Sequence, residues 1–348
     1  MTAATLIDAH GTLPLPWLAS PLARALAAER SHALLLCAAP GAGALALALA
    51  LAQSRLCEAY GLDGPAAPAC GRCDSCRLVA AQTHPDLYVL LPEIERRESG
   101  WLVGDDKPEG DEGKRKPSRQ IRIDDVRGLL DWVTRTSARG RGKMVVLHPA
   151  EALNAHAASA LLKTVEEPPP GTRLVLTCSD AMHVMPTVRS RCQQLVMGAP
   201  DRDVAATWLQ EQGVDEAEAL LAACDGRPLE VLRWRERGID AERWQALPRQ
   251  LGAGRPGVLA GTTVPLAVEL LLKVCHDAMA SAVGGAGRYF ASGSLPARLS
   301  LPALLRWQRE LQRLAESAEH PWHEALAIDA LVSGAQRALA AGATTPAT

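Results

Sequence analysis

Four cysteines in the N-terminal part of the chain have the spacing of metal ligands. Cys70, Cys73 and Cys76 form the run CGRCDSC, and Cys57 lies thirteen residues before the first of them. Two-residue gaps allow successive thiolates to turn onto one ion, and a fourth sulfur completes the tetrahedral shell that zinc prefers. We therefore expect one structural zinc ion per chain, with no coordination position open for a catalytic water.

Two other interpretations compete with the zinc site. A ferredoxin-type iron–sulfur cluster requires a further cysteine just downstream that is followed by proline, and none follows Cys76. Ordinary reduced thiols remain the alternative, because disulfides are rare in a cytosolic chain. Five further cysteines stand isolated among apolar or small residues, which is typical of small buried side chains. These are Cys37, Cys178, Cys192, Cys224 and Cys275.

The stretch LLLCAAPGAGALALALA, residues 34–50, has the outline of a phosphate-binding loop. An apolar run leads into a glycine turn and a helix-forming run, as in the motif G-x-x-x-x-G-K-[ST]. If Gly43 is the last glycine of that motif, the first falls on Ala38, the lysine on Ala44 and the hydroxyl on Leu45. The turn is therefore present without the cation that reaches the outer phosphates and without the hydroxyl that holds magnesium.

The elements that must position these residues alternate between strands and helices. We expect strands at residues 32–38, 84–92, 143–148 and 173–178, and helices at 17–30, from Gly43 onward, within 121–135 and at 155–167. This alternation predicts a mostly parallel sheet with helices on both faces. The helix within 121–135 is expected to be capped by Asp124. Its apolar face carries Val126, Leu129, Leu130 and Val133.

Composition shifts divide the chain into three expected domains. Residues 1–200 form the α/β domain, with the cysteine module at about 57–76 and a charged insertion at about 104–119 that cannot bury enough apolar surface to order itself. A partner-binding tail is the alternative for that insertion. Only helical patterns follow, which predicts a three-helix lid at 201–238 and an all-α bundle at 239–348.

Charge and apolar content limit the class of protein. The formal net charge of -2 argues against a surface that tracks nucleic acid along its whole length, although the basic run ARGRGK at 138–143 could touch DNA phosphates or form a solvated loop. Residues 33–52 are uncharged, but Pro40, Gly41 and Gly43 divide them into a strand and a helix rather than a membrane span. With no export signal in the sequence, we expect a cytoplasmic protein.

Three motifs in order carry a resemblance to a known family. A cysteine module just after a phosphate-loop helix, the run ALLKTVEEPPP at 160–170 and SRC at 190–192 together resemble the clamp-loader branch of the AAA+ proteins, and within it the delta-prime family of bacterial DNA polymerase III. The resemblance implies an α/β AAA+ core with a P-loop-like parallel sheet, a three-helix lid and a helical collar. It extends to the third domain by pattern only.

The resemblance also implies that the nucleotide chemistry has been lost. The loop lysine and hydroxyl of active members fall on Ala44 and Leu45, and their acidic pair after the third strand falls on His148 and Pro149. Their lid arginine falls on Leu229, and the polar residue after the RLVL strand is Cys178 or Ser179. Since removal of one such electrostatic group costs on the order of 100- to 1,000-fold in rate, no functional ATP site is expected.

One catalytic group of the family is present. In clamp loaders the arginine of the SRC motif points toward ATP bound by the neighbouring subunit, which makes Arg191 the expected arginine finger in trans. Arg189 is the adjacent candidate, and an arginine paired with a local carboxylate is the structural alternative.

The resemblance implies a hetero-oligomeric partner set: ATPase subunits and a delta subunit in a heteropentamer, which acts on the sliding clamp at primed DNA. Two rival functions remain. One is an active AAA+ ATPase, such as a helicase loader, with an unusual phosphate loop. The other is a zinc-dependent DNA-binding regulator, which would need a recognition helix and a basic face.

Overall fold

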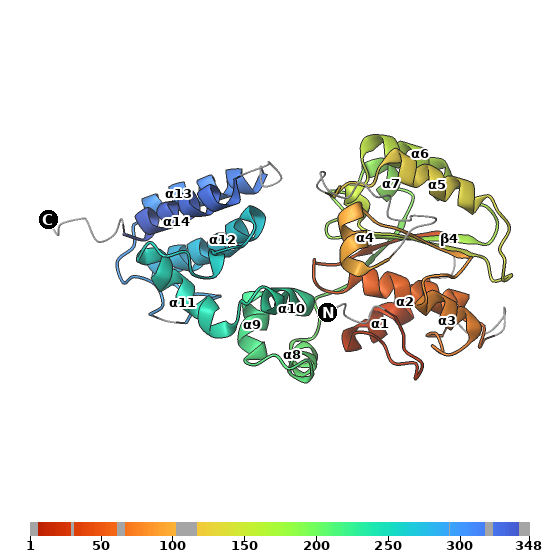
Figure 1. Ribbon diagram of the computed structural model, residues 1–348, viewed down its shortest axis with the longest axis horizontal. Coiled ribbons are helices and arrows are strands. Elements are labelled where there is room, and N and C mark those ends of the chain that lie inside the picture. The colour runs from red at the N-terminus through yellow and green to blue at the C-terminus, as the bar shows by residue number, and fades with distance from the viewer. Residues whose placement is uncertain are drawn as a thin grey trace. The chain divides into compact units, whose positions relative to one another are not determined.

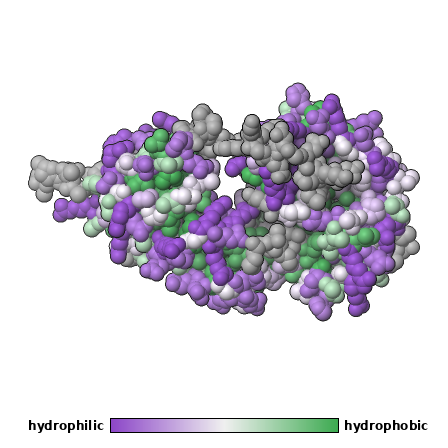
Figure 2. Space-filling model, in the orientation of Figure 1, coloured by the Kyte–Doolittle hydropathy of each residue, from purple (hydrophilic) through white to green (hydrophobic). Residues whose placement is uncertain are grey.

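The computed structural model describes residues 6–28, 31–60, 67–101, 117–291, 293–316 and 323–340. The chain divides into two compact units, Met1–Ala205 and Ala206–Thr348 (Figure 1). Most of the expected insertion, residues 104–116, lies outside the described residues, so its order stays a prediction. Hydrophilic residues cover most of the face drawn in Figure 2, and hydrophobic ones appear in patches between them.

The first unit is built on one five-stranded sheet whose order is β2-β3-β4-β1-β5. Its strands are β1 (Ala33–Cys37), β2 (Leu87–Leu90), β3 (Lys143–Leu147), β4 (Thr172–Cys178) and β5 (Gln193–Val196). Every pairing is parallel, and the register sets Cys37 of β1 beside Cys178 of β4. Strands β1 and β3 are buried throughout, as expected for central strands with both faces covered. The expected parallel sheet is confirmed.

Helices cover both faces of this sheet. In Figure 1, α5, α6 and α7 lie over one face, and α1, α2 and α3 lie on the other side. The helices of the unit are η1 (Pro16–Leu18), α1 (Ala19–Ala27), α2 (Ala44–Leu56), α3 (Asp74–Ala80), α4 (Glu93–Ser99), α5 (Ile123–Val133), η2 (Ala150–Ala152), α6 (Ala155–Glu166) and α7 (Pro186–Arg189). Helix α2 is buried along almost its whole length, because it is apolar all round.

The N-terminus of α5 differs from the expectation. The N-cap residue is Arg122, and Asp124 lies inside the first turn rather than at the cap. The carboxylate of Asp125 accepts the backbone N–H of Arg122 at 2.9 Å. An acid at the third helical position can reach back to the cap in this way, and this is the half of a capping box that the chain uses.

The second unit contains only helices among its described residues. They are α9 (Ala217–Ala223), α10 (Pro228–Glu236), α11 (Ala241–Gly252), η3 (Gly257–Leu259), α12 (Val264–Ala282), α13 (Leu301–Glu316) and α14 (Glu324–Ala340); α8 (Arg202–Glu211) spans the boundary between the units. Trp234 of α10 packs on Trp244 of α11 with ring centroids 5.0 Å apart. The two segments expected as lid and bundle therefore share a core, and a boundary near residue 238 stays a prediction.

Candidate functional site

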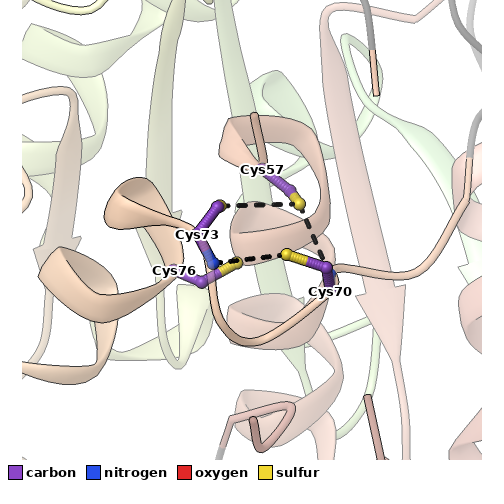
Figure 3. Close-up of side chains that lie close together, drawn as sticks. All are labelled: Cys57, Cys70, Cys73 and Cys76. Atoms are coloured by element: carbon purple, nitrogen blue, oxygen red, sulfur yellow. Dashed lines mark hydrogen bonds between the residues drawn. The ribbon is translucent and has the colours of Figure 1, made fainter. Parts of the chain in front are cut away.

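The structure brings the four spaced cysteines together (Figure 3). Their sulfur atoms all lie within 4.8 Å of one another. Cys57 caps the C-terminus of α2, Cys73 is the N-cap of α3 and Cys76 lies in the first turn of that helix. Cys70 sits on the loop that enters α3, and Gly71 beside it adopts a φ of +69°, where a side chain would collide with the backbone of Asp8. Two helix ends and one glycine turn thus aim the sulfurs at a common point.

The donor set fits a tetrahedral ion. Cys57 Sγ and Cys73 Sγ are 3.8 Å apart, which matches the edge of about 3.8 Å that follows from a Zn–S bond of about 2.3 Å. Backbone N–H groups point at the sulfurs, because Cys70 N donates to Cys57 Sγ at 3.3 Å and Glu58 N donates to Cys73 Sγ at 3.4 Å. Such donors favour the thiolate form that a metal requires. A four-cysteine cluster compatible with structural zinc is therefore present.

The four thiols differ electrostatically. Desolvation by burial acts to raise the pKa of Cys70, but N–H groups of Arg72 and Cys73 outweigh it and hold that pKa at about 7. Burial instead raises the pKa of Cys57 and of Cys76. Cys70 is therefore more readily ionised than the buried Cys57 and Cys76.

The basic run 138–143 packs against the cysteine module. Arg139 Nη2 lies 2.6 Å from Glu58 Oε1, next to Cys57 in the chain, and Arg139 Nε donates to Ser75 Oγ at 3.1 Å, next to Cys76. Arg141 Nη1 donates to the carbonyl oxygen of Tyr60 at 2.8 Å. These two arginines are thus engaged within the chain, and the DNA contact expected of the basic run stays a prediction.

A buried carboxylate organises that same loop. Asp86 is 1% exposed and accepts the backbone N–H groups of Ala138 and Arg139 at 2.7 and 2.8 Å and the hydroxyl of Ser137 at 2.9 Å. These three donors compensate the burial of the Asp86 carboxyl group. The loop is therefore fixed from the sheet side by Asp86 and from the module side by Glu58.

The glycine turn after β1 lies where the sequence indicates. Helix α2 begins at Ala44, and Gly43 before it adopts a φ of +102°. The chain's own N-terminal residues pack against this turn: Trp17 Nε1 donates to the carbonyl oxygen of Ala42 at 2.8 Å, and a Cβ built on Gly43 would come within 2.5 Å of Leu15 Cδ1. Apolar and aromatic side chains thus hold the turn in place, and a side chain at position 43 would disturb them.

The carboxyl end of β3 carries His148 and Pro149, the residues at the expected acidic positions. His148 Nδ1 lies 2.5 Å from Thr177 Oγ1, so the imidazole is engaged by the neighbouring strand. An acid that the sequence analysis did not consider, Glu151 of η2, accepts the backbone N–H of Ser179 at 2.7 Å and also its hydroxyl. Its position four residues after the end of the buried strand β3 was the signal available. Glu151 joins the two strand ends.

Arg191 and Arg189 have different environments. Arg189 Nη1 donates to the carbonyl oxygen of Ala181 at 2.9 Å and is turned back onto its own preceding loop. Arg191 is exposed, forms an ion pair with Glu166 through Nε, and donates from Nη1 to the carbonyl oxygen of Thr187 at 2.8 Å. The local carboxylate named as the structural alternative is therefore present, and it belongs to the ALLKTVEEPPP run.

The remaining cysteines include one unexpected pair. Cys178 Sγ lies 3.2 Å from Cys37 Sγ across neighbouring strands, so these two thiols are not isolated from each other. Cys224 and Cys275 are buried as expected, whereas Cys192 is only partly buried. Burial raises the pKa of Cys192 to about 11 and that of Cys275 to about 12, which favours the protonated thiol at neutral pH.

The fold has a parallel sheet of order β2-β3-β4-β1-β5, a glycine turn between β1 and a buried helix, and helical segments after the sheet. These features define an α/β protein of the AAA+ class. A solved structure of a DNA polymerase III gamma-subunit-related protein from Thermotoga maritima is 14% identical, covers 92% of this chain and 98% of its own, and gives a TM-score of 0.44.

The family model described as DNA polymerase III, delta subunit, matches residues 18–201. DNA polymerase III subunit delta' of Pseudomonas aeruginosa is 36% identical, over 69% of this chain and 68% of its own length, and that of Yersinia pestis is 36% identical over 66% and 62%. DNA polymerase III subunit tau of Escherichia coli is 33% identical over 49% of this chain and 22% of its own length. The chain belongs to the DNA polymerase III delta' family.

Among the described residues, no helix combines the length and the apolar character that crossing a membrane requires.

Proposed function

We propose that this protein is a subunit of a DNA polymerase III clamp loader that does not hydrolyse ATP and that supplies Arg191 to the ATP site of a neighbouring subunit. The observation that carries the proposal is a contrast of charge. Ala44, Leu45 and His148 occupy the positions where hydrolysis needs a lysine, a hydroxyl and an acid, whereas Arg191 is exposed on the same unit.

The packing around the turn supports the first half of the proposal. Helix α2 starts with Ala44 and Leu45, both partly buried, and Trp17 and Leu15 hold the preceding turn. His148 is committed to Thr177, and Oε1 of Glu151 is committed to Ser179, whereas its buried Oε2 has no hydrogen-bond partner among the described residues. The backbone turn keeps the shape of a phosphate cradle, and the chemistry that would act on a triphosphate is missing from the described residues around it.

The partners follow from the family rather than from a contact in the structure. We propose that ATPase subunits of the tau type and a delta subunit assemble with this chain into a heteropentamer that opens the sliding clamp at primed DNA in the cytoplasm. The helices at 201–238 would form the lid, and residues 239–348 the collar. The cysteine cluster would hold one zinc ion, whose role is to fix the module between α2 and α3.

Reconstitution tests the proposal. The chain is combined with the ATPase and delta subunits of its own organism, and clamp- and DNA-stimulated ATP turnover is measured for wild type, Arg191→Ala and the control Arg127→Ala on the solvent side of α5. We expect Arg191→Ala to lower turnover by about 1,000-fold per dependent site and the control to leave it unchanged. Equal turnover in wild type and Arg191→Ala would contradict the trans role.

A second experiment measures ATP hydrolysis by the isolated chain. We expect no magnesium-dependent ATP hydrolysis above background from the purified protein. Sustained turnover by the chain alone would instead establish an active ATPase with an unusual loop.

A further inference from the structure

Glu166 of the ALLKTVEEPPP run forms an ion pair with Arg191 of the SRC run, and the proposed function gives Glu166 no role. It is the last residue of α6, and its carboxylate pairs with Arg191 Nε. Both side chains are partly open to solvent, with 43% exposure for Glu166 and 37% for Arg191. An exposed pair of this kind adds little to stability, so the contact needs another explanation.

The position of Glu166 is unfavourable on its own. The C-terminus of a helix is its negative end, where a carboxylate is repelled and a cation is preferred. Lysine, arginine or histidine would suit this position better, as Lys163 does in the same last turn of α6. A carboxylate here gains a favourable environment only through the cation that it holds.

The guanidinium is held at two points. Glu166 accepts from Nε, and the carbonyl oxygen of Thr187 accepts from Nη1 at 2.8 Å. Two acceptors on different atoms fix the plane of a guanidinium, and Nη2 takes part in neither contact. Thr187 belongs to α7, whose Val188 is fully buried in the same core cluster as Val165 of α6. Both acceptors therefore stand on helices that the core holds rigidly.

We propose that Glu166 is a positioning residue that orients the Arg191 guanidinium toward a phosphate of the neighbouring subunit's nucleotide. The proposal rests on the trans role of Arg191 stated above. An arginine that is already held loses less side-chain entropy when it meets the phosphate, and its Nη2 edge is presented at a fixed angle. Glu166 touches no substrate and acts only through Arg191.

The test is a double-mutant cycle in the reconstituted loader. The variants are Glu166→Gln, Arg191→Ala and the two combined, with Glu167→Gln as the matched control, because it removes the same charge one residue further on and does not contact Arg191. We expect Glu166→Gln to lower kcat for ATP about 5-fold, within the range of coupled neighbours, with KM and the melting temperature unchanged. In the Arg191→Ala background the same substitution should have no further effect on kcat.

The conservative variant adds a readout that a structural role would not produce. Glu166→Asp keeps the charge with a shorter reach, and we expect it to recover part of the lost kcat. Unchanged or increased turnover in Glu166→Gln, or losses that add fully in the double variant, would overturn the positioning role and leave the finger itself intact. Unchanged turnover in Arg191→Ala would instead refute the finger, and with it this inference.

Discussion

Lys273 Nζ lies 2.6 Å from Asp225 Oδ2, and the same ammonium group donates to the carbonyl oxygen of Ala223 at 2.8 Å. Lys273 is on α12, in the expected collar, whereas Asp225 follows α9, in the expected lid. Arg227 extends the link by donating to Glu269 of α12 at 2.8 Å. Charged groups therefore tie the two helical segments of the second unit together, in addition to the apolar contact between their tryptophans.

Removal of the lysine should weaken this unit. The Lys273 side chain is 6% exposed, so Lys273→Met leaves a carboxylate without its principal partner. We expect a loss of about 2 kcal/mol in the free energy of unfolding, less than for a fully buried pair because Asp225 keeps 28% of its side-chain exposure. Calorimetric unfolding checks this, with Lys163→Met on the exposed side of α6 as the control. Equal melting profiles for Lys273→Met and wild type would contradict it.

Acid should weaken the same contact. Burial acts to raise the pKa of Asp225, but hydrogen bonds from Lys273 and Tyr289 outweigh it and hold that pKa below its usual value. A carboxylate whose folded pKa is lowered stabilises the protein above its unfolded pKa of about 3.9, and this contribution is lost as the pH falls through the folded value. Urea unfolding at pH 5, 4 and 3 should show a steeper loss for wild type than for Asp225→Asn. An equal loss of unfolding free energy in the two proteins would argue against a stabilising contact between Asp225 and Lys273.

Metal analysis tests the cysteine cluster. We expect about one zinc ion per chain in wild type and in Cys192→Ser, and loss of that ion in Cys73→Ser, because three remaining thiolates leave the tetrahedral shell open. Chelation should also lower the melting temperature of wild type, since a structural ion contributes its binding energy to folding. Wild-type protein that holds no zinc after purification in zinc-containing buffer would refute the site.

The contact of the cysteine module with the 137–142 loop can be measured by a double-mutant cycle. The side chains of Arg139 and Glu58 are 29% and 31% exposed, and we expect Arg139→Ala and Glu58→Gln to show a coupling energy of about 1 kcal/mol. The control pair is Arg127 with Asp124, whose side chains are 66% and 80% exposed and should show a coupling near zero. Similar coupling energies in both pairs would contradict a stabilising contact between Arg139 and Glu58.

Restoring the phosphate loop alone should not restore hydrolysis. Ala44→Lys combined with Leu45→Thr supplies the missing cation and hydroxyl, but His148 still stands where an acid is needed, and each absent group costs on the order of 100-fold or more. We expect phosphate release by this double variant to stay at background. Turnover that rises with the double substitution would show that the strand ends retain a working acid, for which Glu151 would be the candidate.

The sequence predicted the central architecture, because its signals are local. Buried apolar runs identified β1 to β4, and glycine with proline marked the turn before α2. Strand β5 was missed, since Gln193 and Gln194 are exposed at the sheet edge and carry no apolar run. The cap of α5 was assigned to Asp124, but the N-cap is Arg122, and Asp125 inside the first turn accepts its backbone N–H.

The site was predictable where its residues are close in sequence, and not where they meet only through the fold. Regular spacing indicated the four cysteines, which lie together over a short stretch of chain. The pairing of Arg139 with Glu58, 81 residues away, depends on strand order, and so does the approach of Cys37 to Cys178. Both motifs that contain Glu166 and Arg191 were recognised, but their contact needed the packing of α6 against α7.

The placement of Glu166 at the end of α6 has a consequence for sequence variation. Once Arg191 is replaced, the carboxylate sits uncompensated at the negative end of a helix, at a cost of about 0.3–1 kcal/mol. Relatives that have given up the arginine should therefore also have drifted at the glutamate, so that the two positions are kept or lost together. An aligned set of such chains would display this as covariation between two columns 25 residues apart.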